Sequence, residues 1–526
     1  MKLQISNIDI GVIFFYFILV LFVSWLAQRK KSEKASDYFL GGKDLSWFLV
    51  GASLFASNIG SEHLIGLAGS GASSGLAVAQ FEILACFILL ILGWFFAPYY
   101  LAGSITTMPE FLEKRYNKSC RSYLSIVSVL SYILTKVSVN IYAGATIFEV
   151  LGIPFWQGAF ILVSVTGVYT ILGGLRAVIY TDTLQMVVMI AGAALTTVLG
   201  VLKLGGITEI ASSVPVDFLS LWRPSDHPDF PWTGIIFGAP ILGIWYWCTD
   251  QFVVQRVLAA KNIKEARRGT LFAGFLKLLP MFIFVLPGVL CYVLAQKNMI
   301  PLEKSDHALI SLIQYILPEG IRGIVIAGLF AALMSSLSSV FNSCSTLIVH
   351  DFFKKYSPQS SEKKLILVGQ IATVVIVLLG MMWIPLMKTV SGNLFNYLQS
   401  IQAYISPPIA SVFLFGILSK KINGKGAFLS LILGFLIGTG RLFLEINKSI
   451  VPESLNWFVQ MNFLHFAFFL FVISTLVLFT SSYFFTESVS DHSTIKKVED
   501  LQLDKTDYVL TGLLIFCVAG VWIIFS

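Results

Sequence analysis

The chain has 526 residues, of which 56% are hydrophobic and only 12% are charged. A soluble core cannot bury so large an apolar share, so the composition excludes an ordinary soluble protein and indicates an all-α polytopic membrane protein. The formal net charge of +7 comes from short basic clusters between apolar runs, and this pattern excludes a continuous basic face for nucleic acid.

Apolar runs of about twenty residues or more, the length that crosses a bilayer, predict about fourteen transmembrane helices. The first run, 8–27, is followed by basic residues and lacks a small-residue cleavage site, so we expect a retained helix and no signal peptide. The predicted spans are 8–27, 48–72, 76–100, 122–150, 155–174, 178–202, 234–257, 270–296, 321–350, 364–386, 392–417, 425–445, 460–484 and 507–526.

The stretch 51–75, GASLFASNIGSEHLIGLAGSGASSG, is too polar and too rich in glycine for an ordinary membrane helix. One interpretation is a broken helix, which survives at membrane depth only against protein or a water-filled cavity and which transporters use to bind ions and solutes. The alternative is close helix packing through small residues. The residues of this stretch alone favour neither interpretation.

Basic clusters fall in alternate connections, and the positive-inside rule makes that side cytoplasmic and places both termini outside. Two groups of five spans would enter the membrane with opposite orientations and form inverted repeats. The predicted organisation is a first helix with its linker (1–47), a first repeat (48–203), an external connection (204–233), a second repeat (234–417), and additional C-terminal helices (418–526) with a cytoplasmic linker at 486–507.

Ionisable side chains inside predicted spans are functional candidates, because each is costly unless paired or hydrated. They are His63, Glu82, Lys136, Asp182, Asp250 and Lys277. Several structural alternatives stay open: Asp182 as an interfacial residue, Asp250 paired with Arg256, and Lys136 as a tie between helices. Glu82 and Lys277 lack counter-charges in their own spans, so they either pair with each other or, with Asn58, His63 and Gln399, bind the hydroxyls of a neutral polyol.

Ala332, Ser335, Ser336 and Ser339 lie at helical spacing and form a stripe of small and hydroxyl-bearing residues. Such a stripe offers either oxygen ligands to Na⁺ or a close packing surface. Tyr246 and Trp247 offer either stacking faces for a sugar or interfacial aromatic rings. Six singly scattered cysteines predict free thiols and no structural metal.

Several blocks in one order resemble the sodium/solute symporter family, and within it the sodium/glucose and sodium/myo-inositol cotransporter branch. They include DYFLGGKDLSWFLVGASLFASNIGSEHLIGLAGSG, TMPEFLEKRYN, GGLRAVIYTDTLQ, WYWCTDQFVVQRVLAAKN, FLKLLPMFIFVLPG, RGIVIAGLFAALMSSLSSVFNS and NYLQSIQAYISPPIA. The resemblance implies a LeuT-like fold of inverted five-helix repeats with broken first helices. It also favours the broken-helix interpretation of 51–75.

The resemblance further implies roles for single positions. The sodium site matches Ala56, Ile59, Ala332, Ser335 and Ser336, and a second sodium site matches Asp182, Ser338 and Ser339. The sugar site matches Asn58, His63, Glu82, Lys277 and Gln399, with Tyr246 as inner gate, Trp247 beside it, and Phe81 and Gln402 as walls. Gly243 departs from the pattern, since sugar-transporting relatives often have a polar side chain there, and this leaves the identity of the sugar open.

The expected function is sodium-coupled import of a neutral monosaccharide of the glucose or galactose type, with two Na⁺ per sugar, across the plasma membrane, or the inner membrane of a bacterium. The alternatives are a symporter for myo-inositol or another polar solute and, from a different class, a non-transporting sugar sensor or a sodium leak channel. No HExxH motif appears, and we expect no enzyme, no organic cofactor and no obligate protein partner.

Overall fold

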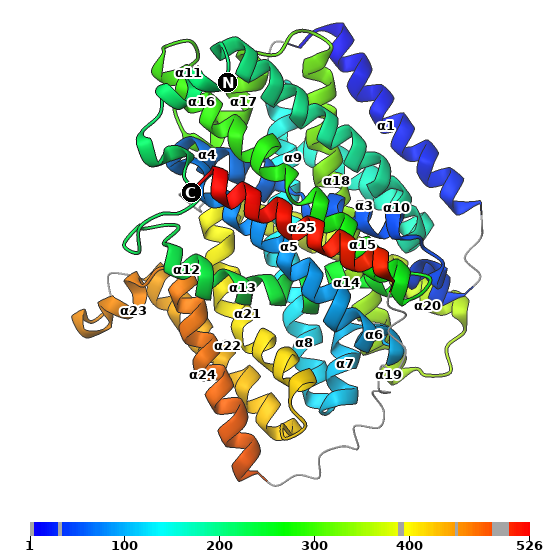
Figure 1. Ribbon diagram of the computed structural model, residues 1–526. Coiled ribbons are helices and arrows are strands. Elements are labelled where there is room, and N and C mark those ends of the chain that lie inside the picture. Colours follow the sequence, from blue (N-terminus) through cyan, green and yellow to red (C-terminus); the bar gives the residue numbers. More distant parts are fainter. Residues whose placement is uncertain (1–4, 30–33, 388–393, 448–450, 486–503) are drawn as a thin grey trace.

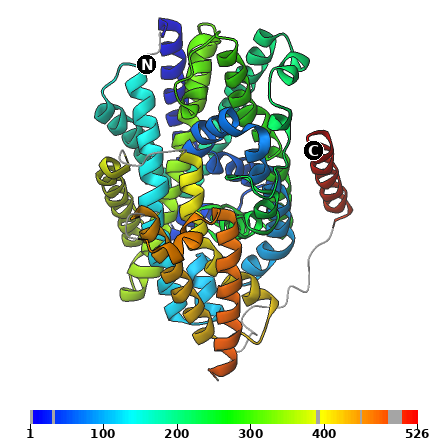
Figure 2. The same cartoon turned by 90° about the vertical axis from the view of Figure 1, so that its left-hand side faces the viewer.

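The computed structural model describes residues 5–29, 34–387, 394–447, 451–485 and 504–526. This part of the chain is built from helices and contains no strand, only two isolated β-bridges. The long helices pack side by side in one bundle (Figures 1 and 2). The predicted all-α class is therefore confirmed.

Eleven helices of the described chain are long and apolar enough to cross a membrane, so the predicted number of about fourteen is not confirmed. The difference arises at three places where a predicted span is interrupted or fused with its neighbour. At one of them, predicted spans 155–174 and 178–202 are joined in α10 (Phe155–Leu204), which consists of two helical segments that meet at a kink, where Gly174 is non-helical (φ 57°, ψ −158°). A Cβ atom at Gly174 would collide with the Tyr38 carbonyl oxygen, so only glycine fits this bend.

The second place is the glycine-rich stretch, which forms a broken helix as predicted. The first half, α3 (Trp47–Asn58), ends where Ile59 adopts an extended conformation (φ −74°, ψ 111°). The chain becomes helical again as the π-helical turn η2 (Glu62–Leu67), continued by α4 (Ala68–Ser74). Residues around the interruption are buried, as an unwound segment at membrane depth requires.

The third place is predicted span 234–257, which is also broken. It consists of α12 (Trp232–Phe237), α13 (Ala239–Gly243), the π-helical turn η7 (Ile244–Thr249) and α14 (Gln251–Leu258). Asp250 separates η7 from α14 in an extended conformation (φ −80°, ψ 126°). Both spans expected to be broken are thus interrupted, whereas the inverted repeats at 48–203 and 234–417 stay a prediction.

The remaining long helices lie close to the predicted runs, and several short helices lie in the connections between those runs. In the first half they are α1 (Asn7–Gln28), α2 (Ala35–Leu40), η1 (Gly41–Lys43), η3 (Gly75–Ala79), α5 (Gln80–Ile91), η4 (Leu92–Phe96), α6 (Ala97–Ala102), α7 (Met108–Arg115), α8 (Lys118–Ser131), η5 (Tyr132–Val137), α9 (Ser138–Val150), α11 (Ile207–Ser212) and η6 (Val216–Leu219). In the second half they are α15 (Ile263–Leu276), η8 (Met281–Val285), α16 (Leu286–Gln296), η9 (Ser305–His307), α17 (Ala308–Tyr315), α18 (Ile321–Leu347), η10 (Ile348–Phe353), α19 (Lys354–Tyr356), α20 (Glu362–Met387), α21 (Leu394–Leu418), α22 (Gly424–Ile446), η12 (Glu453–Leu455), α23 (Asn456–Gln460), α24 (Phe463–Phe484) and α25 (Lys505–Ile524).

The predicted linker 486–507 is too long at its C-terminal end. Residues 486–503 lie outside the described residues, but Asp504 caps α25 by accepting a hydrogen bond from the Thr506 amide at 3.0 Å. The helix therefore begins at Lys505, because the side-chain cap stabilises the first turn even though that turn is polar.

Helix α18 lies at the centre of the bundle, and α1 and α25 lie at its edge. In the most apolar stretch of the span that includes α18, 94% of the residues are buried, against 22% for α1 and 17% for α25. α18 packs along α10 and also contacts α3. The serine stripe that it carries is consequently held in the interior, next to the broken helix.

Candidate functional site

The residues implied for the solute line one cavity with an empty volume of about 580 Å³, which includes the part open to solvent. It is bordered by the break between α3 and η2, by α5, by α13 and η7, by the C-terminal end of α15, and by α21. The predicted residues that it brings together are Asn58, His63, Phe81, Glu82, Tyr246, Trp247, Lys277, Gln399 and Gln402. Gly243 also borders the cavity, and a Cβ atom there would approach Ile88 Cγ1 at 2.9 Å.

Lys277 and Glu82 form a buried ion pair across this cavity. The Lys277 ammonium donates hydrogen bonds to the Glu82 carboxylate and to the Asn58 side-chain oxygen. The other Glu82 oxygen lies 3.2 Å from His63 Nε2. Of the two arrangements left open by the sequence, the structure has these side chains paired, and the pairing offsets the cost of two charges at membrane depth.

Tyr246 closes one side of the same network. Its hydroxyl accepts a hydrogen bond from Asn58 Nδ2 at 3.0 Å and another from Lys136 Nζ at 3.4 Å. Lys136 Nζ also lies 4.5 Å from the centre of the Tyr246 ring and 4.0 Å from Glu62 Oε1. The interpretation of Lys136 as a tie between helices is confirmed. Sequence reasoning missed Glu62, although its position next to His63 in the predicted broken helix could have indicated a place in the site.

The break in the first discontinuous helix redirects two backbone amides. In a continuous helix the amides of Gly60 and Ser61 would donate to the carbonyls of Ala56 and Ser57. Instead Gly60 donates to His63 Nδ1 at 3.5 Å and Ser61 donates to Asn140 Oδ1 at 3.0 Å. The carbonyl of Ala56, one of the predicted sodium ligands, is therefore released from the bond that a helix would give it.

The serine stripe meets this break at Ser336. Asn140 Nδ2 donates to Ser336 Oγ at 3.3 Å, and a Cβ atom at Gly60 would lie 3.2 Å from Ser336 Oγ. Asn140 thus contacts both the redirected Ser61 amide and the stripe. Sequence reasoning missed Asn140, because an asparagine in a distant span gives no local sign that it faces the break.

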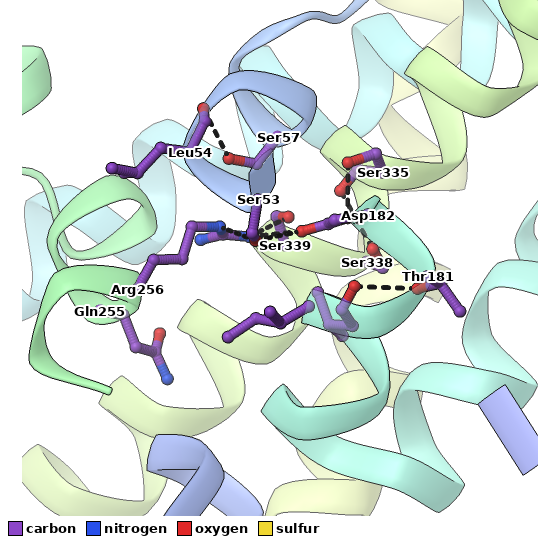
Figure 3. A network of polar contacts seen from close by, with 12 residues as sticks. Ser53, Leu54, Ser57, Thr181, Asp182, Gln255, Arg256, Ser335, Ser338 and Ser339 are labelled. Carbon is purple, nitrogen blue, oxygen red and sulfur yellow. Dashed lines mark hydrogen bonds and ion pairs between the residues drawn. The ribbon is translucent and has the colours of Figure 1, made fainter. Parts of the chain in front are cut away.

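Asp182 lies in a separate polar network beside the stripe (Figure 3). Its two carboxylate oxygens accept hydrogen bonds from Ser335 Oγ at 2.6 Å and from Ser53 Oγ at 2.5 Å. The Arg256 guanidinium lies 3.6 Å from Asp182 Oδ2 and donates to the hydroxyl of Ser339.

Two alternatives from the sequence are wrong. Asp182 is not an interfacial residue, because its side chain is fully buried. Arg256 does not pair with Asp250, because its guanidinium binds Asp182.

The two predicted sodium groups are adjacent and share contacts. Ser335, assigned to the first group, bonds to Asp182 of the second. Ser338 Oγ donates to the Ser335 carbonyl at 3.0 Å, and no direct bond joins Asp182 to Ser338 or Ser339 among the bonds of the described residues. Ser53 and Arg256 complete this network, and neither was predicted.

Two interrupted helices around a central polar cavity are typical of membrane transporters with discontinuous helices. A Na⁺-coupled sialic acid symporter, solved in a substrate-bound outward-open state, superposes with a TM-score of 0.80 at 24% identity, covering 92% of this chain and 99% of that one. A nucleobase-cation-symport-1 family transporter, Mhp1, superposes with a TM-score of 0.52 at 12% identity, covering 92% and 99%. At these identities the likeness concerns the fold alone.

Sequence similarity identifies the family. The profile of the sodium:solute symporter family matches residues 38–434, and the chain belongs to this family. Sodium/glucose cotransporter 1 of Ovis aries is 38% identical over 92% of this chain and 79% of the relative. Sodium/myo-inositol cotransporter 2 of Mus musculus is 42% identical over 83% of this chain and 70% of the relative. The protein is a multi-pass, sodium-coupled solute symporter and not an enzyme.

Proposed function

We propose that this symporter imports a neutral monosaccharide of the glucose or galactose type with two Na⁺ per sugar. The observation that carries the proposal is the pairing of Lys277 with Glu82 in the cavity. Glu62 has a cation close by as well, since Lys136 Nζ lies 4.0 Å from its carboxylate. The cavity consequently offers hydrogen-bond donors and acceptors without a surplus charge, which suits hydroxyl groups and disfavours a sugar acid.

Sodium and sugar would be coupled through the broken helix. Na⁺ would bind between the carbonyls of Ala56 and Ile59, the carbonyl of Ala332 and the hydroxyls of Ser335 and Ser336. Asn58, held by Lys277 and Tyr246, follows Ala56 by two residues in the same helix end. An ion that fixes this helix end also fixes Asn58 toward the sugar, so each ligand raises the affinity of the other by the same factor.

The second ion would bind near Asp182, Ser338 and Ser339, and alternating access would then expose both ligands to the cytoplasm. We place the protein in the plasma membrane, or the inner membrane of a bacterium, with both termini outside. Each Na⁺ that enters down the membrane potential contributes about 2.3 kcal/mol per 100 mV, so two ions support steep accumulation of a neutral solute.

Uptake by proteoliposomes with an inward Na⁺ gradient tests the substrate class. We expect labelled glucose or galactose to accumulate above its external concentration, and unlabelled sialic acid not to compete. If myo-inositol competes and glucose and galactose do not, the monosaccharide assignment is wrong and the second candidate holds. That candidate is supported by the similarity to the sodium/myo-inositol cotransporter. Solute-dependent current without accumulation would contradict symport and point to a sensor or a leak channel.

A further inference from the structure

A second, smaller cavity borders the break in the other discontinuous helix. It has an empty volume of about 290 Å³ and is lined by residues of α8, η5, η7 and α21, with Asp250 at the break itself. Along α21 the solute cavity reaches Gln402, and the smaller cavity begins at Ile405 and extends to Ile409. The two cavities therefore lie one after the other along α21, about one helical turn apart.

The Asp250 carboxylate is only half satisfied. Oδ1 accepts hydrogen bonds from the Tyr132 hydroxyl and from the Phe252 amide at 3.1 Å, the second of which caps α14. Oδ2 is buried and has no hydrogen-bond partner, and the residue is only 5% exposed. No lysine, arginine or histidine nitrogen of the described chain lies within 4.0 Å of this carboxylate, since the nearby Arg256 binds Asp182.

Capping alone does not account for this acid. The cap uses one oxygen, which an asparagine would supply without a buried charge. Asp250 borders a cavity that is also lined by the hydroxyl-bearing residues Ser128, Ser131 and Thr249. Thr249 Oγ1 donates its hydrogen to the Trp245 carbonyl at 2.7 Å. Toward any other neighbour this hydroxyl can therefore act only as an acceptor or as a ligand.

We propose that the Asp250 cavity binds an alkali-metal cation, Na⁺ or K⁺. A single carboxylate with neutral hydroxyl oxygens matches a hard monovalent ion, whereas Ca²⁺ and Mg²⁺ draw on more oxygen ligands. The site lies at the C-terminal end of the half-helix η7, and such helix ends coordinate Na⁺ in transporters with discontinuous helices. It is distinct from both proposed sodium groups, which use α3, α10 and α18.

The position of the cavity suggests when the ion binds. Its α8 residues, which lie within 124–131, follow the basic cluster at 114–121. The positive-inside rule assigns that end of α8 to the cytoplasm. The cation would therefore reach Asp250 from the cytoplasmic side.

Equilibrium binding of ²²Na⁺ to the purified full-length protein in detergent, with no solute, tests the proposal. We expect Asp250→Asn to lose one bound Na⁺ per protein, or to weaken one binding component at least about tenfold, a change of about 1.4 kcal/mol. Unlabelled K⁺ should displace the same component from the wild-type protein if the site accepts both ions, and leave it in place if the site is selective for Na⁺.

Matched variants separate this site from the others. Ser131→Ala removes a hydroxyl-bearing side chain that lines the cavity and should weaken the same component, whereas Ser125→Ala, on the same helix with its hydroxyl bonded to the Arg121 carbonyl, should not.

If Asp250→Asn does not fold, the double variant Ser128→Ala with Ser131→Ala replaces it in the binding measurement. Ser336→Ala should remove a different ion, so loss of sugar transport or of the Ser336 component leaves this test intact. Unchanged Na⁺ and K⁺ binding in Asp250→Asn and in the serine variants, or an effect only on pH dependence, overturns the proposal.

Discussion

Lys277 contacts two of the groups that face the solute, Glu82 and Asn58, from the C-terminal end of α15. The replacement Lys277→Ala would leave the buried Glu82 carboxylate with His63 as its remaining polar partner. Removing one partner of a buried ion pair costs about 3–5 kcal/mol. We therefore expect a lower unfolding temperature in detergent and loss of solute uptake.

A double variant separates stability from binding. Lys277→Met combined with Glu82→Gln removes both charges and should recover most of the unfolding temperature, because no buried charge is left unpaired. Solute affinity should stay low, since the donor and the charged acceptor for hydroxyl groups are both gone. Transport by the double variant at wild-type affinity would show that the pair is structural only.

At this scale the sequence indicated the ionisable residues of the cavity but not all their partners. Glu82 and Lys277 stood out because each lies in an apolar run, and they meet as one of the two interpretations expected. Asn140 and Ser53 are ordinary polar residues in their own spans. They matter because helices far apart in the chain converge on Ser336 and Asp182, and no local pattern encodes that convergence.

The break between α3 and η2 depends on the absence of a side chain at Gly60. A Cβ atom there would lie 3.0 Å from Asn140 Oδ1 and 3.2 Å from Ser336 Oγ, so the two groups would have to move apart. We expect Gly60→Ala to raise the Na⁺ concentration for half-maximal uptake at least about fivefold, in line with an overpacking cost of about 1–3 kcal/mol.

A matched glycine provides the control. Gly440 lies in α22, and a Cβ atom there meets nothing within 4 Å. Gly440→Ala should leave the Na⁺ dependence unchanged and stabilise the helix slightly. If Gly60→Ala behaves like Gly440→Ala, the packing of Gly60 against Ser336 has no part in sodium binding.

Element type was predictable from the apolar runs, but the continuity of single spans was predictable only where the family resemblance implied a break. Hydrophobicity continues through Gly174, where the backbone of α10 leaves the helical conformation and kinks against Tyr38. The run 234–257 was expected to be broken only from the family resemblance, because its hydrophobicity does not mark the point at Asp250 where the chain unwinds. Contacts with other helices decide both outcomes. The positions of the apolar spans were therefore predictable from the sequence, but the number of membrane-crossing helices was not.

At the scale of the whole molecule, we expect the group around Asp182 to set the charge moved per cycle. Asp182→Asn keeps acceptor and donor atoms for Ser335 and Ser53 but removes the charge that would hold a second Na⁺. We expect the Na⁺:solute ratio to fall from two to one. In a reversal-potential measurement, a tenfold solute gradient then shifts the potential by about 59 mV where it shifted it by about 30 mV before.

Thr181→Val serves as the comparison for this variant. Thr181 is buried beside Asp182 on α10, and its hydroxyl bonds to carbonyls of its own helix. The ratio should stay at two in Thr181→Val. A ratio that is the same in wild type and Asp182→Asn would remove Asp182 from the ion-binding groups and leave it as the partner of Arg256.

The last helix, α25, has a mechanical consequence for the transport cycle. At one end Asp507 bonds to Arg268 of α15 at 2.8 Å, and at the other Trp522 Nε1 donates to Gln80 of α5 at 2.9 Å. α15 carries Lys277 at its end and α5 carries Glu82, so α25 is a brace across the two helices that form the ion pair (Figure 1). Because α25 is bonded to both helices, we expect α5, α15 and α25 to move together when the solute cavity opens.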